Sequence, residues 1–283
     1  MKKLVSVVVP SYNSVAFIDA TIESILNQTF ADFELLISDH GSTDGTWEAL
    51  QKYTVDSRVR LSQLPSGGGG VANWKAVTDA ASGEFIKLVC GDDLLYPNCL
   101  ERQVQALIEH PSAVLAASSK DVIDATGATL IRNRGLAGMH GEVDGADAIR
   151  RSLRAGTNIL GEPASVLFRR QALIEAGGWD GRLPYLLDQA TYSAVLLRGN
   201  LVAVPGPLAA FRVSSTQWSV RLVREQAEQF IDFHRSFAAA HPGLLSGPDL
   251  AIGGVRARFN AVARRAVYLW LGRRMAGNMR ATA

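Results

Sequence analysis

The N-terminal part of the chain alternates short apolar runs with amphipathic stretches. The apolar runs are rich in β-branched residues and predict buried strands at residues 5–9, 33–38, 59–64 and 85–89. Between them, apolar side chains recur on one helical face and predict helices at residues 15–28, 46–53, 71–81 and 100–109. Because strands and helices alternate, we expect an α/β fold with a Rossmann-like, mostly parallel sheet flanked by helices.

The pattern is looser in the second half of the chain. Shorter apolar runs predict strands at residues 114–118, 122–124, 162–168, 201–204 and 209–213. Helical spacing predicts helices at residues 171–176, 185–198, 220–240 and about 252–275. The glycine-rich stretch at residues 127–145 favours a mobile or substrate-facing loop. We therefore expect one α/β domain over residues 1–213 and a helical C-terminal extension over residues 214–283.

Composition is that of an ordinary soluble protein, with 47% apolar and 20% charged residues. No stretch approaches the roughly 18 uninterrupted apolar residues of a membrane-spanning helix. The first apolar run ends at Pro10, which does not fit a signal peptide. Cys90 and Cys99 are the two cysteines; they form neither a disulfide framework nor a zinc pattern, and they favour a reducing cytoplasm.

Charge is unevenly distributed, although the net charge is only +2. From residue 221 onward the chain has ten arginines and four acidic residues, so a basic tail follows a mildly acidic body. Such a tail suits an anionic surface, whether a membrane or a nucleic acid. Between residues 256 and 274 the arginines interleave with apolar side chains, which suits a helix lying on anionic lipid. A helix packed on the N-terminal body, with its arginines in water, explains the pattern equally well.

Polar residues stand where three of the predicted strands end. Tyr12 and Asn13 follow the first strand, Asp39 follows the second, and Asp92 and Asp93 follow the fourth. Any one of them would suit a turn or a helix cap. Because ligands of open parallel sheets bind outside the carboxyl ends of the strands, their convergence favours a site. Adjacent carboxylates repel each other, and Mg²⁺ prefers such oxygen ligands together with substrate phosphates.

The glycine run at residues 67–70 matches neither standard phosphate-binding motif. A dinucleotide fingerprint would follow the first strand, where Pro10 stands, and the Gly-Lys-Ser/Thr of a Walker motif is absent. A flexible loop explains this composition better, although glycines ahead of a helix can offer backbone N–H groups to an anion. Asn73 and Lys75 lie one turn into the following helix and could reach a bound diphosphate.

Several motifs in series carry a family resemblance. They are VSVVVPSYN at residues 5–13, ISDHGSTDGT at 37–46, GDDLLYP at 91–97, GGWD at 177–180, Asp188, and Phe211-Arg212. In this order they resemble a family 2 glycosyltransferase, over about residues 4–213. The resemblance implies a GT-A fold, a nucleotide-diphosphate-sugar donor and inversion of the anomeric centre.

The resemblance also implies a role for each matching residue. The nucleoside pocket would be lined by Pro10, Tyr12, Asn13 and Asp39. Asp39 would accept a hydrogen bond from the base, and Asp92 would meet the ribose. Asp93 would ligate the Mg²⁺ or Mn²⁺ that bridges the diphosphate, and Asp188 would be the catalytic base. A carboxylate at the start of a helix, favoured by the helix dipole, is the simpler explanation of Asp188.

Two positions depart from the family pattern. His40 stands where the family usually has a second acid after Asp39, and Cys90 stands where many members carry an acid. Both departures reduce the negative charge around a cation, so most of its protein ligation would fall on Asp93. Residues 213–216 contain no histidine, so no late histidine ligand is expected.

On the acceptor side, the expected residues are Trp179 and Asp180. Trp74, Trp179 and Trp218 have flat rings that could stack on a sugar, although core packing is the usual role of tryptophan. Trp179 stands beside Asp180 and ahead of Asp188, so it is the tryptophan that we expect to face the acceptor.

The sequence therefore predicts an inverting, metal-dependent glycosyltransferase of cell-surface polysaccharide synthesis. The donor would be a UDP- or dTDP-linked sugar, and the acceptor a hydroxyl of a glycan or a lipid-linked sugar. We expect a cytoplasmic enzyme that contacts the inner membrane face through residues 252–275, and no nucleic-acid partner. The alternatives are a nucleotidyltransferase, against which Pro10 and its following turn speak, and a non-catalytic sugar-nucleotide-binding relative, which His40 and Cys90 would suit.

Overall fold

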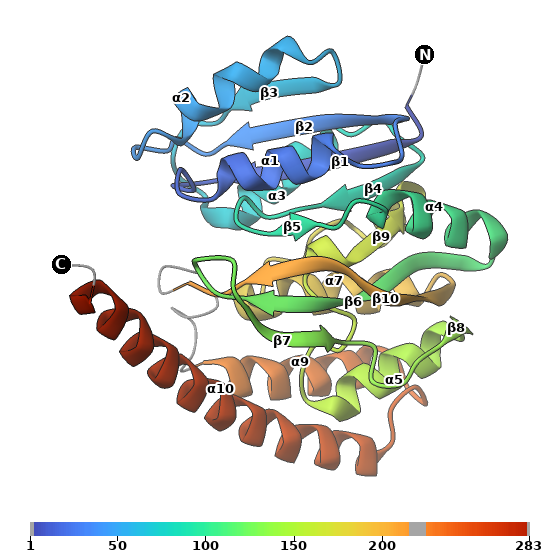
Figure 1. The fold of residues 1–283 in the computed structure, drawn as a ribbon. Helices are drawn as coiled ribbons and strands as arrows, with labels where there is room; N and C mark the ends of the chain where they lie inside the picture. Colours follow the sequence, from blue (N-terminus) through green and yellow to red (C-terminus); the bar gives the residue numbers. More distant parts are fainter. Residues whose placement is uncertain (1–2, 215–224, 282–283) are drawn as a thin grey trace.

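In the computed structural model, helices cover both faces of one curled sheet (Figure 1). The structure describes residues 3–214 and 225–281, with side chains up to residue 265. The N-terminal strands form one end of the molecule, and the two C-terminal helices lie at the other end (Figure 1). The predicted α/β class with flanking helices is confirmed.

The sheet is mixed, with the strand order β3-β2-β1-β4-β9-β6-β10-β5, while β7 pairs with β6 and β8 pairs with β10. Strand β1 is parallel to β2 and β4, whereas β9 runs antiparallel to both β4 and β6. The strands are β1 (Val5–Ser11), β2 (Phe33–Asp39), β3 (Val59–Gln63), β4 (Phe85–Leu88), β5 (Leu94–Leu95), β6 (Ala113–Ile123), β7 (Thr129–Arg134), β8 (Gly141–Val143), β9 (Val166–Arg169) and β10 (Asn200–Arg212).

The helices follow the strands much as the periodicity predicts in the first half. The α-helices are α1 (Ile18–Leu26), α2 (Thr46–Gln51), α3 (Gly69–Asp79), α4 (Cys99–Glu109), α5 (Gly145–Ala155), α6 (Arg170–Glu175), α7 (Leu187–Leu196), α9 (Gln226–Ala240) and α10 (Gly247–Ala281). Within residues 3–214 and 225–281, three short 3₁₀ helices are η1 (Lys52–Val55), η2 (Pro163–Ser165) and η3 (Pro184–Leu186).

Two hydrophobic cores lie on the two faces of the sheet. On one face, Val7 and Val9 of β1 belong to the same buried cluster as Ile22 of α1. On the other face, Val8 belongs to a cluster that contains Tyr192 of α7. Because successive strand residues point to opposite faces and both faces are covered, the central strands are apolar without interruption.

The register places the functional strand ends at one edge. Ser11 at the end of β1 pairs with Asp39 at the end of β2, and Val8 pairs with Leu88 at the end of β4. Since β9 is antiparallel to β4, the residues just before β9 also lie at the edge where β4 ends. The sheet therefore gathers polar groups from strands of both directions at this edge.

Two strands are longer than the sequence suggested. The strands expected at residues 114–118 and 122–124 form the single strand β6, because Lys120 and Asp121 are buried within the sheet instead of breaking it. The strands expected at residues 201–204 and 209–213 form the single strand β10. Its Pro-Gly-Pro sequence is absorbed in an irregularity between Val204 and Ala209, where a proline removes no regular ladder bond.

One predicted loop and one further predicted strand also differ from expectation. Residues 127–145 were expected to be a loop, but they include β7 and β8, which pair with β6 and β10. The strand expected at residues 162–168 begins only at Val166, because η2 precedes it.

The C-terminal helices share a core with the sheet. Phe230 of α9 and Ala257 of α10 belong to the same buried cluster as Tyr192 of α7. These helices correspond to those predicted at residues 220–240 and 252–275, although residues 220–224 and Trp218 lie outside the described residues. The division of the chain into 1–213 and 214–283 stays a prediction. Within the described ranges, no helix combines the length and apolar character needed to cross a membrane.

Helix α5 begins at a tight contact, and a substitution there tests this packing. A Cβ atom on Gly145 would lie 2.2 Å from the carbonyl oxygens of both Leu196 and Gly199. Because backbone atoms cannot rotate away, we expect Gly145→Ala to lower the free energy of unfolding by about 1–3 kcal/mol. Gly247→Ala is the control, since its Cβ would meet nothing within 4 Å. Urea unfolding followed by circular dichroism measures both, and equal midpoints for the two variants would contradict the packing described.

Candidate active site

The loops after β1 and β2 are tied together at the carboxyl edge of the sheet. The backbone N–H of Asn13 donates to Ser42 Oγ at 2.9 Å, and the N–H of Thr43 donates to Asn13 Oδ1 at 2.9 Å. Asn13 has a φ of 48°, in the left-handed region that asparagine tolerates better than most residues. Through these two hydrogen bonds, Asn13 links the two loops into one structure.

Asp39 is buried at the base of these loops. Its carboxylate accepts hydrogen bonds from the Ser42 hydroxyl, from the Ser42 N–H at 3.0 Å and from Gln63 Nε2 at 3.1 Å. Tyr12 is 56% exposed beside it, and its ring lies edge-on to the buried His40, with 6.2 Å between ring centres. An exposed aromatic ring above a buried carboxylate is suited to hold a flat heterocycle.

Asn73 and Lys75 do not share a target. Asn73 is buried, and its Nδ2 donates to the carbonyl oxygens of Ser11 at 3.2 Å and Ser38 at 3.1 Å, so it ties the ends of β1 and β2 together. Lys75 is exposed and lies on another side of α3. Residues two positions apart on a helix point in directions about 200° apart around its axis. Asn73 and Lys75 therefore cannot both face one diphosphate.

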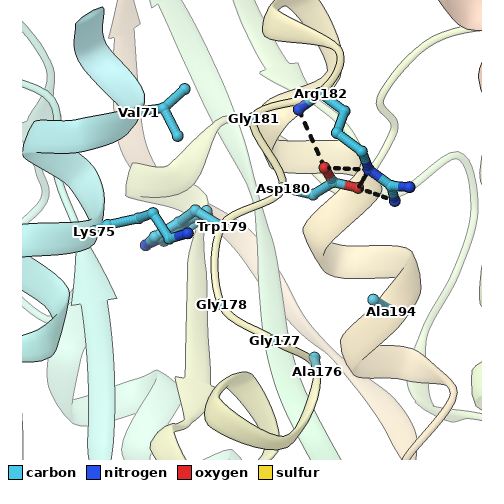
Figure 2. Close-up of a pocket in the computed structure, with 10 residues that line it drawn as sticks. All are labelled: Val71, Lys75, Ala176, Gly177, Gly178, Trp179, Asp180, Gly181, Arg182 and Ala194. Atoms are coloured by element: carbon cyan, nitrogen blue, oxygen red, sulfur yellow. Dashed lines mark hydrogen bonds and ion pairs between the residues drawn. The ribbon is translucent and has the colours of Figure 1, made fainter. Parts of the chain in front are cut away.

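Lys75 lines an open pocket between α3 and the loop that connects α6 with α7 (Figure 2). The pocket has a volume of about 620 Å³. Asp180 stands on its wall and binds Arg182 with both carboxylate oxygens, which lowers the pKa of Asp180. The lining residues are Val71, Lys75, Ala176, Gly177, Gly178, Trp179, Asp180, Gly181, Arg182 and Ala194.

Trp179 contributes less to this pocket than expected. Its ring is only 2% exposed, its Nε1 donates to Thr78 Oγ1 at 2.8 Å, and it stands edge-on to Trp74 at 4.9 Å between ring centres. The ring packs in the core and offers no face to a sugar, so the expected stacking role is not supported.

Asp92 and Asp93 lie beside Arg212 of β10. Asp93 is 1% exposed and accepts from the backbone N–H of Arg212 at 3.0 Å. Nε of Arg212 donates to the carbonyl oxygen of Asp92 at 2.9 Å, and its guanidinium lies 4.8 Å from the centre of the Phe17 ring. Burial and the charge of Asp92 raise the pKa of Asp93 well above its usual range. Burial and the neighbouring carboxylate therefore disfavour the charged form of Asp93 within the described part of the chain.

This carboxylate pair fits a hard divalent cation. Its donors are oxygens, and a cation would relieve the repulsion that raises the pKa of Asp93. In the part of the chain that is described, no three His, Cys, Asp or Glu side chains are grouped closely enough to hold a metal ion. A cation at Asp93 would therefore need oxygens from a bound molecule or water, as Mg²⁺ commonly does. Burial and Asp93 raise the pKa of the Cys90 thiol, so Cys90 adds no charge.

Lys120 and Glu162 belong to this site and were not predicted from the sequence. Lys120, late in β6, is 3% exposed and forms an ion pair with Glu162, which directly precedes η2 and β9. The charges of both residues act on Asp93 and on Asp188, which shows that the four side chains lie together. The available signal was the polar run at residues 118–121 between two apolar runs.

Asp188 is fixed at the start of α7 by two hydrogen bonds. Asn158 Nδ2 donates to one carboxylate oxygen at 2.8 Å, and the N–H of Gln189 donates to the other at 2.7 Å. Burial, and next the negative charge of Glu162, raise the pKa of Asp188 to about 6, against the lowering effect of these bonds and of Lys120. Each oxygen keeps acceptor capacity, so an oriented carboxylate of raised basicity faces the site. Asn158 was not predicted, because a loop asparagine carries no periodic signal.

Known proteins resemble this chain in sequence. Residues 6–176 match the family model described as Glycosyl transferase family 2. A curated relative from Escherichia coli, the UDP-Glc:alpha-D-GlcNAc-diphosphoundecaprenol beta-1,3-glucosyltransferase WfgD, is 37% identical over 38% of this chain and 42% of its own length. Three relatives at 34–37% identity are matched over only 38–45% of their own length.

Solved structures share the fold. TarS residues 1–349 of S. aureus in complex with UDP-GlcNAc superposes with a TM-score of 0.66 at 21% identity, over 84% of this chain and 66% of that one. The mannosyltransferase PcManGT of Pyrobaculum calidifontis, in complex with GDP-Man and Mn²⁺, gives a TM-score of 0.64 at 18% identity, over 98% and 81% of the two chains. The predicted GT-A fold is confirmed by these likenesses.

Proposed function

The chain belongs to glycosyl transferase family 2, and on that premise we propose that it transfers a sugar from a nucleotide-diphosphate donor to an acceptor hydroxyl, with inversion. The observation that carries the proposal is that the same two charges, Lys120 and Glu162, act on the pKa values of both Asp93 and Asp188. One site thus holds Asp93, a buried carboxylate that a cation would stabilise, and Asp188, an oriented carboxylate of raised basicity.

The donor nucleoside lies at the joined loops after β1 and β2. Pro10, Tyr12 and Asn13 line its pocket, and Asp39 meets the base at the floor. The exposure of Tyr12 supports stacking, while Asn73 positions the strand ends behind the pocket and does not touch the diphosphate. The UDP-GlcNAc bound to TarS supports a UDP-linked sugar, and a dTDP-linked sugar carries thymine, which is uracil with an added methyl group.

Asp93 would hold the divalent cation, and Asp92 would meet the ribose of the donor. When bound, Mg²⁺ or Mn²⁺ stabilises the negative charge that develops on the departing diphosphate. The Mn²⁺ in the PcManGT complex supports a divalent ion. Arg212 keeps Asp92 and Asp93 in place through two hydrogen bonds. The neutral Cys90 leaves Asp93 as the main protein ligand.

Asp188 acts as the catalytic base. It removes the proton of the acceptor hydroxyl as the oxygen attacks the anomeric carbon from the side opposite the diphosphate, which inverts the configuration. Asn158 and the Gln189 N–H orient the carboxylate, and each leaves it acceptor capacity for that proton. Asp180 and the pocket beside Lys75 lie on the acceptor side, since the Asp180 N–H donates to Thr191, one turn after Asp188.

The acceptor is a glycan or a lipid-linked sugar at the inner membrane face. The name of WfgD, which includes a diphosphoundecaprenol acceptor, supports this class of acceptor. Val255, Phe259 and Val262 of α10 are 65%, 72% and 64% exposed and recur at helical spacing, and the neighbouring Arg258 is exposed as well. An apolar stripe flanked by arginine suits anionic lipid. The side chains of residues 266–275 in the predicted segment lie outside the described residues.

Donor and cation binding are expected to depend on each other. UDP at about 100 times its Kd should stabilise the protein by about 2.7 kcal/mol, and we expect most of this only with Mn²⁺ present. Asp93→Asn should lose the Mn²⁺-dependent part, because the cation loses its main protein ligand. Thermal-shift titration with UDP, dTDP and GDP measures the effect, with Asp79→Asn as an exposed control. If stabilisation of Asp93→Asn by UDP depends on Mn²⁺ as strongly as in wild type, Asp93 is excluded as the ligand.

The pH dependence of turnover reports on Asp188. The base must be deprotonated, so kcat should fall as pH drops below about 6, the pKa to which burial and Glu162 raise this group. Asp188→Asn should lose about 100-fold or more in kcat while still binding UDP. Glu162→Gln should move the acid limb to lower pH and Lys120→Met to higher pH. UDP release measures turnover, and a limb that moves the same way in both variants would refute the assignment.

Membrane contact is tested by vesicle flotation. The protein should float with vesicles rich in phosphatidylglycerol and not with phosphatidylcholine alone. Replacing Val255, Phe259 and Val262 by serine should abolish flotation. The matched control replaces Val55, Ile108 and Ile174, which are also exposed but lie on other elements. Equal flotation of the two triple variants would show that α10 does not dock on the membrane.

A further inference from the structure

The turn that ends α5 connects the C-terminal helix to Asp188. Helix α5 ends at Ala155 and is capped by Gly156, whose φ is 65°. Helix α10 crosses this cap so closely that a Cβ on Gly156 would lie 2.4 Å from the backbone nitrogen of Ala257. Asn158, the hydrogen-bond donor to Asp188, follows Gly156 with only Thr157 between them. The contact is therefore next to the catalytic carboxylate along the chain.

Two side chains of α10 hold this turn. Asn260 Nδ2 donates to the carbonyl oxygens of Ala155 at 3.0 Å and Gly156 at 3.1 Å. Arg264 Nη1 donates to the hydroxyl of Thr157 at 3.1 Å. Together these bonds cover three consecutive residues and use the carbonyl groups that the end of α5 leaves unpaired. They fix the backbone immediately before Asn158.

The same arginine also supports the other approach to Asp188. The guanidinium of Arg264 lies 5.5 Å from the centre of the Tyr185 ring, three residues before Asp188, and its Nε donates to Gln226 at 2.7 Å. The backbone N–H of Tyr185 in turn donates to Gln229 of α9. Helices α9 and α10 thus contact the chain on both sides of the catalytic carboxylate.

The side-chain amide of Asn158, which donates to Asp188, is held by hydrogen bonds on both its nitrogen and its oxygen. Its Nδ2 donates to Asp188 and to the carbonyl oxygen of Gly161 at 2.7 Å. Its Oδ1 accepts from the N–H groups of Leu160 at 3.0 Å and Gly161 at 3.2 Å. Because the three bonds other than that to Asp188 are made within one turn, a shift of the backbone at residue 157 moves the amide as a unit.

We propose that α10 is a positioning element for the catalytic base: Asn260 and Arg264 hold the turn at residues 155–157, and this turn sets the orientation of Asp188 through Asn158. The proposal rests on the function of Asp188 proposed above. The C-terminal helices are then part of the catalytic apparatus, although none of their described side chains needs to touch the substrates.

The first experiment measures the coupling without any substrate. Asn260→Ala combined with Arg264→Ala should accelerate hydrogen–deuterium exchange in peptides that cover residues 155–162 and 185–190, while the strands β1 to β4 keep their protection. Arg235→Ala, an exposed arginine on α9, is the matched control and should change neither peptide. Unchanged exchange at residues 185–190 in the double variant would overturn the proposal.

The second experiment measures the catalytic consequence. With UDP-GlcNAc or UDP-glucose and Mn²⁺, UDP release by the double variant should show a kcat about 10- to 100-fold lower, with a KM within about twofold of wild type, since donor contacts are untouched. Asn158→Ala should show the same split, and adding Asn260→Ala to it should cause little further loss, because the two residues act in series.

These results separate the two proposals. If wild type releases UDP and the double variant matches Arg235→Ala in kcat, or if Asn158→Ala and Asn260→Ala losses multiply independently, α10 does not position the base. If wild type releases no UDP from either donor, the proposed function fails instead, and the exchange experiment still decides whether α10 holds residues 185–190.

Discussion

Charge compensation among buried carboxylates is the constraint on which the candidate site depends. Asp93 is almost fully buried beside Asp92, and burial, followed by the charge of Glu162, raises the pKa of Asp188 to about 6. Lys120 is the buried cation whose charge acts on both Asp93 and Asp188. Full compensation would remove the affinity of Asp93 for a metal ion and the basicity of Asp188. Partial compensation preserves both, and it leaves the remaining charge to be met by a substrate complex.

The mixed sheet is what brings these groups together. In a purely parallel sheet the start of β9 would lie at the far edge from the end of β4. Because β9 runs antiparallel to β4 and β6, Glu162 reaches the carboxyl edge, where Lys120 arrives late in β6. Outside the sheet, the turn after α5 positions Asp188, and helix α10 holds this turn through its buried face while its opposite face exposes apolar side chains. Fold and site are therefore one arrangement.

The sequence predicted the parts of this arrangement that repeat or that end a strand. Burial on both faces produces unbroken apolar runs, so β1 to β4 were located closely, and Asp39 and Asp93 were expected at one edge. Side-chain direction was harder to predict, since Asn73 and Lys75 point to different places and Trp179 is buried. Lys120 suggested a break in a strand, because a charge in a buried strand is unusual unless it is paired. Its partner Glu162 lies 42 residues further along the chain, beyond the reach of any local pattern.

The central claim is that Asp93 holds a divalent cation together with a donor diphosphate at an edge whose charge is only partly compensated. Electron paramagnetic resonance of Mn²⁺, titrated with the protein in the presence and absence of UDP, tests this claim most directly. The account predicts weak Mn²⁺ binding without UDP and binding at least about tenfold tighter with UDP, because the diphosphate completes the shell. Mn²⁺ affinity that UDP leaves unchanged, whether strong or weak, would contradict it.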